Sequence, residues 1–268
     1  MIIDALPIWA LFLVTVAFIV GMVEVGFRIG KSVRRHTDEE RESPVSAIAG
    51  AILGLTAFML AFTFSMASDR YDTKKGLVRE EANIIRTTWE RADFLREPDR
   101  TRTKALLREY VDDRITFAQE LDPTKTESAV AGAIRKHQEI WAIAVENTRT
   151  DPFMFSDLGS LYMDSVNQMA EINALRVNLG LQARIPTGIW FVLFALLVLG
   201  MIGVGYQTAI ADSRRSRVTS ILALSFALVI ALIAALDHPM NSFITVSQTA
   251  MVNLQTEINT PSTPAIRP

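Results

Sequence analysis

Few residues in this chain have the type and spacing that catalytic or metal chemistry requires. The 268 residues include no cysteine, which excludes thiolate catalysis, disulfides and thiolate metal sites. The three histidines, His36, His137 and His238, lie far apart and form no metal-binding pair. Glu80 and Glu81 are adjacent, so on a helix they point about 100° apart, and we interpret them as a solvated charged face. The sequence therefore predicts no enzyme, no metal site and no cofactor.

Polar residues at the ends of apolar segments are the next candidates, because ionisable groups near a membrane span are costly and are often functional. Glu24 precedes Arg28 by four residues, an order that favours an ion pair on a helix; structural pairing and a role in ion coordination both remain open. The others could anchor a membrane-proximal domain as a polar collar or ring the mouth of a pore. The six candidates are Glu24, Arg28, Asp69, Arg70, Asp237 and His238.

The second apolar segment carries a pattern that could line a pore. It is rich in small residues, and Gly50 and Gly54 form a Gly-x-x-x-Gly pair that allows close helix approach. Phe58, Phe62 and Met66 follow at intervals of four residues. This pattern fits packing within the chain or contact with lipid. Alternatively, the segment lines the axis of an oligomer, where the stripe would form a hydrophobic constriction that gates by dewetting.

Four uncharged apolar segments position these residues. At about 1.5 Å per residue, each is long enough to cross about 30 Å of hydrocarbon as a helix. The segments are residues 5–23, 45–68, 185–211 and 218–236. The chain is therefore expected to be a multi-pass membrane protein in contact with the lipid bilayer. Its net charge of -2 gives no indication of nucleic-acid binding.

The block between spans two and three, residues 69–184, is predicted to be helical. Pro98-Asp99, Asp122-Pro123 and Asp151-Pro152 are helix-start signals that divide it into four helices. The predicted fold is all-α: four transmembrane helices plus a four-helix bundle inserted between spans two and three, with bundle helices continuous with the spans. The expected divisions are 1–68 (spans one and two), 69–184 (bundle), 185–238 (spans three and four), 239–259 (an amphipathic helix) and 260–268 (a disordered tail).

Charge predicts the orientation of these spans. The two short loops, 28–44 and 212–217, hold eight basic residues, whereas the segment before span one holds none. The positive-inside rule then puts the short loops in the cytoplasm of a bacterial cell. The bundle and both termini would lie outside the inner membrane. Four basic residues after span two oppose this orientation: Arg70, Lys74, Lys75 and Arg79.

Short motifs in the chain resemble a bacterial membrane family of unknown function that is described as bestrophin-like. They are Glu24-Val-Gly-Phe-Arg28, the small-residue span ending in Asp69-Arg70-Tyr71, Glu80-Glu-Ala-Asn83 and Leu236-Asp-His-Pro239. The resemblance implies kinship with bestrophins, which are oligomeric anion channels with four membrane helices per subunit and a pore-lining second span. It also implies a cytosolic helical domain, opposite to the charge count, and the chain lacks the acidic calcium-binding run of animal bestrophins.

Two functions follow from these observations. The first is a homo-oligomeric ion channel or channel-like protein in which span two lines the axis. The alternative is a membrane-anchored sensor or interaction protein whose extracytoplasmic bundle binds a ligand or partner. The short cytoplasmic loops could not hold a signalling module, so this alternative requires a separate partner.

Overall fold

The computed structural model describes residues 7–34, 42–120, 122–181, 184–211, 218–237 and 244–260. Within these residues the chain is helical and has no strand, which confirms the predicted all-α class. The chain divides into two compact units. The first unit is Met1–Tyr71 with Arg184–Ile244, and the second unit is Asp72–Ala183 with Thr245–Pro268.

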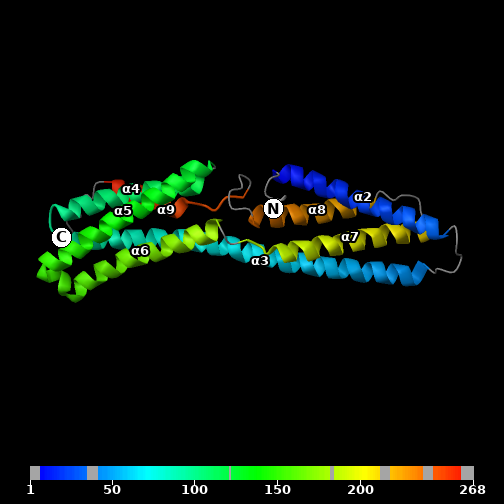
Figure 1. The fold of residues 1–268 in the computed structure, drawn as a ribbon, viewed down its shortest axis with the longest axis horizontal. Helices are drawn as coiled ribbons and strands as arrows, with labels where there is room; N and C mark the ends of the chain where they lie inside the picture. The colour runs from blue at the N-terminus through cyan, green and yellow to red at the C-terminus, as the bar shows by residue number, and fades with distance from the viewer. Residues whose placement is uncertain are drawn as a thin grey trace, which may run out of the picture. The chain divides into compact units, whose positions relative to one another are not determined.

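Four helices are long and apolar enough to cross a bilayer, as the four uncharged segments predict. They are α2 (Ile8–Arg34), α3 (Glu42–Arg91), α7 (Thr187–Ile210) and α8 (Val218–Asp237). Figure 1 shows these helices in the colours of the chain order. The 50 residues of α3 form one uninterrupted helix, which passes through Gly76 and contributes residues to both units.

Glycines bring α2 and α7 into direct backbone contact within the first unit. A Cβ atom built on Gly26 would overlap the carbonyl oxygen of Ile202, and one on Gly205 would overlap that of Val23. At Gly30, such an atom would lie 2.8 Å from the carbonyl oxygen of Tyr206. Close approach of this kind is how small residues hold membrane helices together by van der Waals packing. The core around this contact is formed by large buried side chains such as Ile19, Leu193 and Met201.

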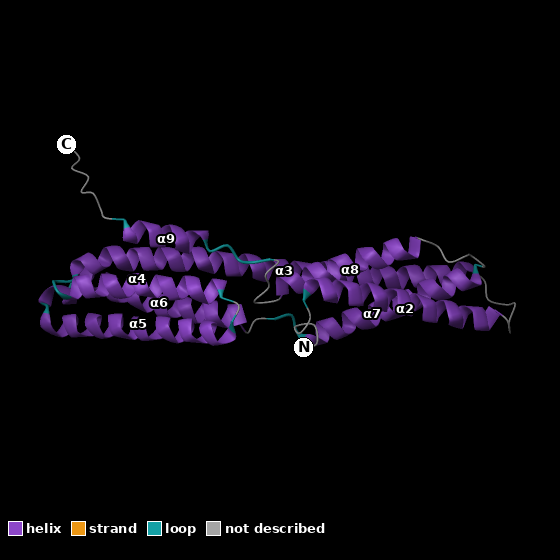
Figure 2. Cartoon of the chain, turned by 90° about the horizontal axis from the view of Figure 1, so that it is seen from above, coloured by secondary structure: helices purple, strands orange, loops and turns teal. Residues whose placement is uncertain are grey.

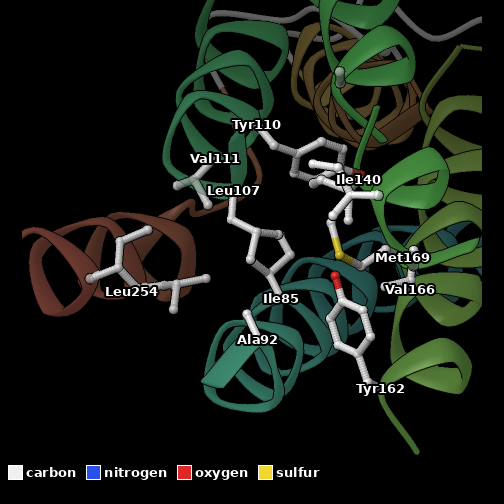
Figure 3. Close-up of a cluster of buried hydrophobic side chains, with 14 of the residues drawn as sticks. Ile85, Ala92, Leu107, Tyr110, Val111, Ile140, Tyr162, Val166, Met169 and Leu254 are labelled. Carbon is white, nitrogen blue, oxygen red and sulfur yellow. The ribbon is translucent and has the colours of Figure 1, made fainter. Parts of the chain in front are cut away.

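The second unit is built from α4 (Asp99–Gln119), α5 (Pro123–Thr150), α6 (Asp157–Leu181), α9 (Thr249–Asn259) and the last part of α3. Figure 2 shows these helices as purple ribbons. Two single turns of 3₁₀ helix, Ala92–Phe94 and Pro152–Phe155, precede α4 and α6. Apolar side chains from all five helices meet in one core (Figure 3), including Ile85, Leu107, Ile140, Met169 and Leu254.

The start of α5 shows how local sequence signals act. The Asp122 carboxylate accepts hydrogen bonds from the backbone N–H and the hydroxyl of Thr124, at 2.9 and 2.6 Å. The hydrogen bonds from Thr124 hold the pKa of Asp122 below its usual value. Pro123 follows at the first helical position, where a backbone N–H would have no hydrogen-bond partner within the helix.

Some predicted boundaries differ from the structure. The last helix of the middle block was expected to continue into span three, but α6 ends at Leu181 and α7 begins at Thr187. Residues 184–186 are not helical, because Pro186 holds an extended conformation before α7 and favours the same in its predecessor. The C-terminal helix begins at Thr249, about ten residues later than expected. The predicted disordered tail is 260–268, and all of it after residue 260 lies outside the described residues.

Candidate functional site

One face of α3 packs against the rest of the first unit. Its buried residues recur at helical spacing and are small or apolar, except for two threonines: Ala49, Thr56, Leu60, Thr63 and Ala67. The hydroxyls of Thr56 and Thr63 donate to the carbonyls of Ile52 and Met59, both at 2.7 Å, so neither is left unpaired. Ala49 also lies close to α7, because a Cβ atom built on Gly203 would be 3.3 Å from the Cβ atom of Ala49.

The opposite face of α3 is largely exposed and does not pack against other described residues. Phe58 is 66% exposed and Phe62 is 52% exposed. A Cβ atom on Gly50 or Gly54 would meet no described atom within 4 Å. The Gly-x-x-x-Gly pair therefore does not mediate packing within the described chain, and its face is free to contact lipid or another molecule.

Met66 departs from the predicted stripe. It is half-buried, whereas Phe58 and Phe62 are exposed. At 3.6 residues per turn, each step of four residues rotates about 40° around the helix. Two such steps carry Met66 toward the edge of the exposed face.

The exposed face of α3 differs in composition from those of the other membrane-capable helices. Helices α2, α7 and α8 expose large side chains, such as Leu13, Phe191 and Leu228. Between residues 47 and 65, α3 exposes the large side chains of Ile48, Leu55, Phe58, Phe62 and Phe64 as well as seven small residues. The small residues are Ala47, Gly50, Ala51, Gly54, Ala57, Ala61 and Ser65. Small residues are enriched where membrane helices contact one another.

The structure brings two of the predicted polar residues together. Arg70 near the end of the apolar part of α3 lies 3.6 Å from the Asp237 carboxylate at the end of α8. The same carboxylate accepts a hydrogen bond of 2.9 Å from the backbone N–H of Ile185. Asp237 at the end of α8 therefore contacts both Arg70 of α3 and Ile185, which lies just before α7. Asp69 is exposed, and His238 lies outside the described residues.

Glu24 and Arg28 form an ion pair within α2. Their side chains are 2.9 Å apart, and Arg28 is 77% exposed. Pairs of this kind contribute little to stability because water screens them. The predicted ion pair is therefore present, and a role of Glu24 in ion coordination stays a prediction.

A buried ionic cluster in the second unit was not predicted. Glu81 of α3 is fully buried, so interpreting Glu80 and Glu81 together as a solvated face is wrong for Glu81, although Glu80 is exposed. The Glu81 carboxylate accepts a hydrogen bond of 2.7 Å from Nε of Arg114 and another from a terminal amine of Arg176. Arg114 is fully buried and Arg176 is 6% exposed.

Neighbouring groups complete this cluster. The Tyr110 hydroxyl donates to Glu81 over 3.4 Å, and the second amine of Arg176 donates to Gln248 over 3.2 Å. Burial, assisted by the charge on Glu81, raises the pKa of Tyr110 far above its usual value, so the phenol keeps its proton and remains a donor. Burial lowers the pKa of Arg176, and Glu81 opposes that shift.

A sequence signal for this cluster exists. Glu81 lies three residues after Val78 and four before Ile85, inside the apolar stripe of its helix. Arg114 lies between Val111 and Ala118 in the same way. Charges that each lie within the apolar stripe of a helix indicate a buried ionic cluster, since an unpaired charge in a core is strongly unfavourable. Among the described residues, no group of three His, Asp or Glu is placed to hold a metal ion.

Comparison with known proteins identifies the class to which this fold belongs. The family model of the Bestrophin-like domain matches residues 13–251. The chain therefore belongs to the Bestrophin-like family, as the resemblance of its short motifs predicts.

Two solved structures share the fold. A crystal structure of a membrane protein aligns with a TM-score of 0.63 and 14% identity, covering 94% of this chain and 97% of the other. A bacterial bestrophin homologue from Klebsiella pneumoniae, crystallised with a mutation, aligns with a TM-score of 0.60 and 13% identity, covering 92% and 98%. None of the curated proteins matches the chain.

Proposed function

We propose that this protein is a homo-oligomeric ion channel in which the exposed face of α3 lines the shared axis. One observation carries the proposal: between residues 47 and 65, α3 exposes seven small residues beside five large apolar ones, whereas the exposed residues in the apolar parts of α2, α7 and α8 are mainly large. Large apolar side chains suit lipid, and small residues allow neighbouring copies to approach closely. Membership of the Bestrophin-like family supports the same function, because the resemblance to bestrophins implies oligomeric channels with a pore-lining second span.

The phenylalanines would form the narrowest part of the path. Phe58 and Phe62 lie on the same exposed face, one turn apart, with Gly54 one turn before them and Ser65 one turn after. Repeated around a symmetry axis, they would make two stacked aromatic rings without a charged group. Such a constriction conducts when hydrated and blocks ions when it dries. The candidate lining residues are thus Gly50, Gly54, Phe58, Phe62 and, at the edge of the face, Met66.

Current through the reconstituted protein tests this function. Purified full-length protein in planar bilayers with symmetrical KCl is expected to carry current above that of protein-free bilayers. In Phe62→Cys, a charged, water-soluble thiol reagent is expected to remove more than half of that current, because the modified side chain occupies the constriction. Phe191→Cys is the matched control: its side chain is 74% exposed on α7, and the proposal assigns it to lipid. Absence of current, or equal sensitivity of the two variants, would contradict the proposal.

We also propose an orientation, with the two short basic loops in the cytoplasm and the second unit and both termini outside. The eight basic residues of loops 28–44 and 212–217 support it through the positive-inside rule. The resemblance to bestrophins implies the opposite sidedness, so this part of the proposal stands on charge alone.

Labelling of single cysteines decides the orientation, since the chain has no native cysteine. Thr124→Cys is expected to react with a membrane-impermeant thiol reagent in intact cells, because Thr124 is an exposed residue at the start of α5. Ser213→Cys, in the second short loop, is expected to react only after lysis. The reverse pattern would put the second unit in the cytoplasm and would leave the channel proposal intact.

A further inference from the structure

Helix α2 carries an exposed apolar face about as long as the hydrocarbon core of a bilayer is thick. Trp9 at its start is 68% exposed, and the side chain of Arg28 near its end is 77% exposed. Between residues 9 and 28 an α-helix rises about 29 Å, close to the ~30 Å of the hydrocarbon. Tryptophan is enriched at membrane–water interfaces, and basic residues follow the ends of spans. Arg28 is therefore at the level of the lipid head groups.

Arg28 and Lys31 form a pair of cations at this level. They are three residues apart, so their side chains leave the same side of α2. Lys31 is exposed and lies in the last turn of the helix. Glu24 accepts a hydrogen bond of 2.9 Å from Nε of Arg28, which orients the guanidinium through an atom other than its terminal amines. Those amines are donors that suit a phosphate, so the two cations together can hold one phosphate group.

The apolar face beside these cations has a notch. Val14, Phe18 and Val25 are exposed and lie on the same face of α2 as Arg28. Gly21 lies between Phe18 and Val25 on this face, and a Cβ atom built on it would meet no described atom within 4 Å. The surface of the helix is therefore recessed at Gly21, between two bulkier side chains that the bilayer would cover.

We propose that this face of α2 binds a membrane phospholipid with an anionic head group. The phosphate accepts hydrogen bonds from Arg28 and Lys31, and one acyl chain lies in the notch at Gly21. Charge selects the ligand, because basic residues next to a membrane span attract anionic head groups. A zwitterionic phospholipid carries a cation of its own, which the two basic side chains would repel.

This inference does not rest on the proposed channel. Every residue that carries it belongs to α2 in the first unit, and none belongs to α3. It also holds for either orientation of the protein, because it requires only that lipid head groups lie at the C-terminal end of α2.

Thermal unfolding in two lipids tests whether the head group matters. Full-length protein in detergent is titrated with dioleoyl phosphatidylglycerol or with dioleoyl phosphatidylcholine, which has the same acyl chains and no net charge. A ligand that binds the folded state raises the midpoint as its concentration increases. We expect phosphatidylglycerol to raise the midpoint by several degrees, with saturation, and phosphatidylcholine to raise it less. Equal rises in the two lipids would overturn the proposal.

Two double variants separate this site from general attraction to basic loops. Arg28→Gln combined with Lys31→Gln is expected to lose the difference between the two lipids. Arg214→Gln combined with Arg215→Gln is the matched control, because it removes the same charge from the loop that follows α7. The end of α7 contacts the end of α2, so both pairs lie on one side of the membrane. The control is expected to keep the difference, and its loss in both double variants would contradict the proposed site.

A photoreactive lipid gives a readout that requires no variant to fold. Wild-type protein in vesicles is labelled with phosphatidylglycerol that carries a diazirine in one acyl chain, and the labelled peptides are mapped by mass spectrometry. The expected label lies on α2 between Val14 and Ile29, and unlabelled phosphatidylglycerol reduces it more than phosphatidylcholine does. Label spread evenly over α2, α7 and α8, or reduced equally by the two lipids, would overturn the proposal.

Discussion

Replacement of Glu81 by glutamine is expected to lower the free energy of unfolding by about 3–5 kcal/mol, the range measured when one partner of a buried ion pair is removed. Glutamine keeps the size of the side chain and one acceptor oxygen. It removes the negative charge that holds Arg114 and Arg176, both of which are at least nine-tenths buried. Two guanidinium groups would then share a core without a counter-charge from the chain.

Glu80→Gln is the matched control, because the same change is made one residue earlier on the exposed side of α3. Surface changes of this kind alter stability by about 0.5 kcal/mol or less. The midpoint of thermal unfolding, followed by circular dichroism in detergent, compares the two variants. Equal midpoints would mean that Glu81 does not hold the two arginines in a buried cluster.

Replacement of Gly26 by alanine is expected to destabilise the first unit by about 1–3 kcal/mol, the usual cost of forcing extra atoms into a packed core. The added methyl group would overlap the backbone of Ile202, which is not a flexible side-chain end that could turn away. Helices α2 and α7 would have to separate along their length, which would also loosen the contacts at Gly30 and Gly205.

Gly21→Ala supplies the comparison within the same helix. A Cβ atom at Gly21 meets no described atom within 4 Å, and alanine favours helix over glycine by up to about 1 kcal/mol. This variant should therefore be as stable as the wild type or more stable. If both alanine variants unfold at the wild-type midpoint, α2 and α7 do not make the close backbone contact described above.

The membrane-capable helices could be predicted from the sequence because each is a long segment without charge. That signal is local, since it needs no knowledge of which residues meet in space. Helix starts such as Asp122-Pro123 were equally visible, because the capping group lies two residues from the N–H that it binds. The interruption at residues 184–186 was underestimated, although Pro186 marked it.

The contacts that hold the helices together were harder to predict. Glu81 meets Arg114 and Arg176, which lie 33 and 95 residues later in the chain. The charge of a residue does not tell whether its side chain is buried or solvated. The available signal was the position of Glu81 and Arg114 within the apolar stripes of their helices. The glycines that pack α2 against α7 were hard to predict for a related reason. Gly50 and Gly54 have the spacing of a packing motif but are open, whereas Gly26 and Gly205 make the contact.

The central proposal, that the exposed face of α3 lines an axis shared by several copies, is tested most directly by cross-linking between copies. A single cysteine is placed at Phe62 or, as the control, at Phe191, and native membranes are treated with a short bifunctional thiol reagent. We expect covalent dimers for Phe62→Cys and none for Phe191→Cys, because the first side chain would face the axis and the second would face lipid. Dimers in Phe191→Cys with none in Phe62→Cys would contradict the proposal and would assign α3 to the lipid-facing surface.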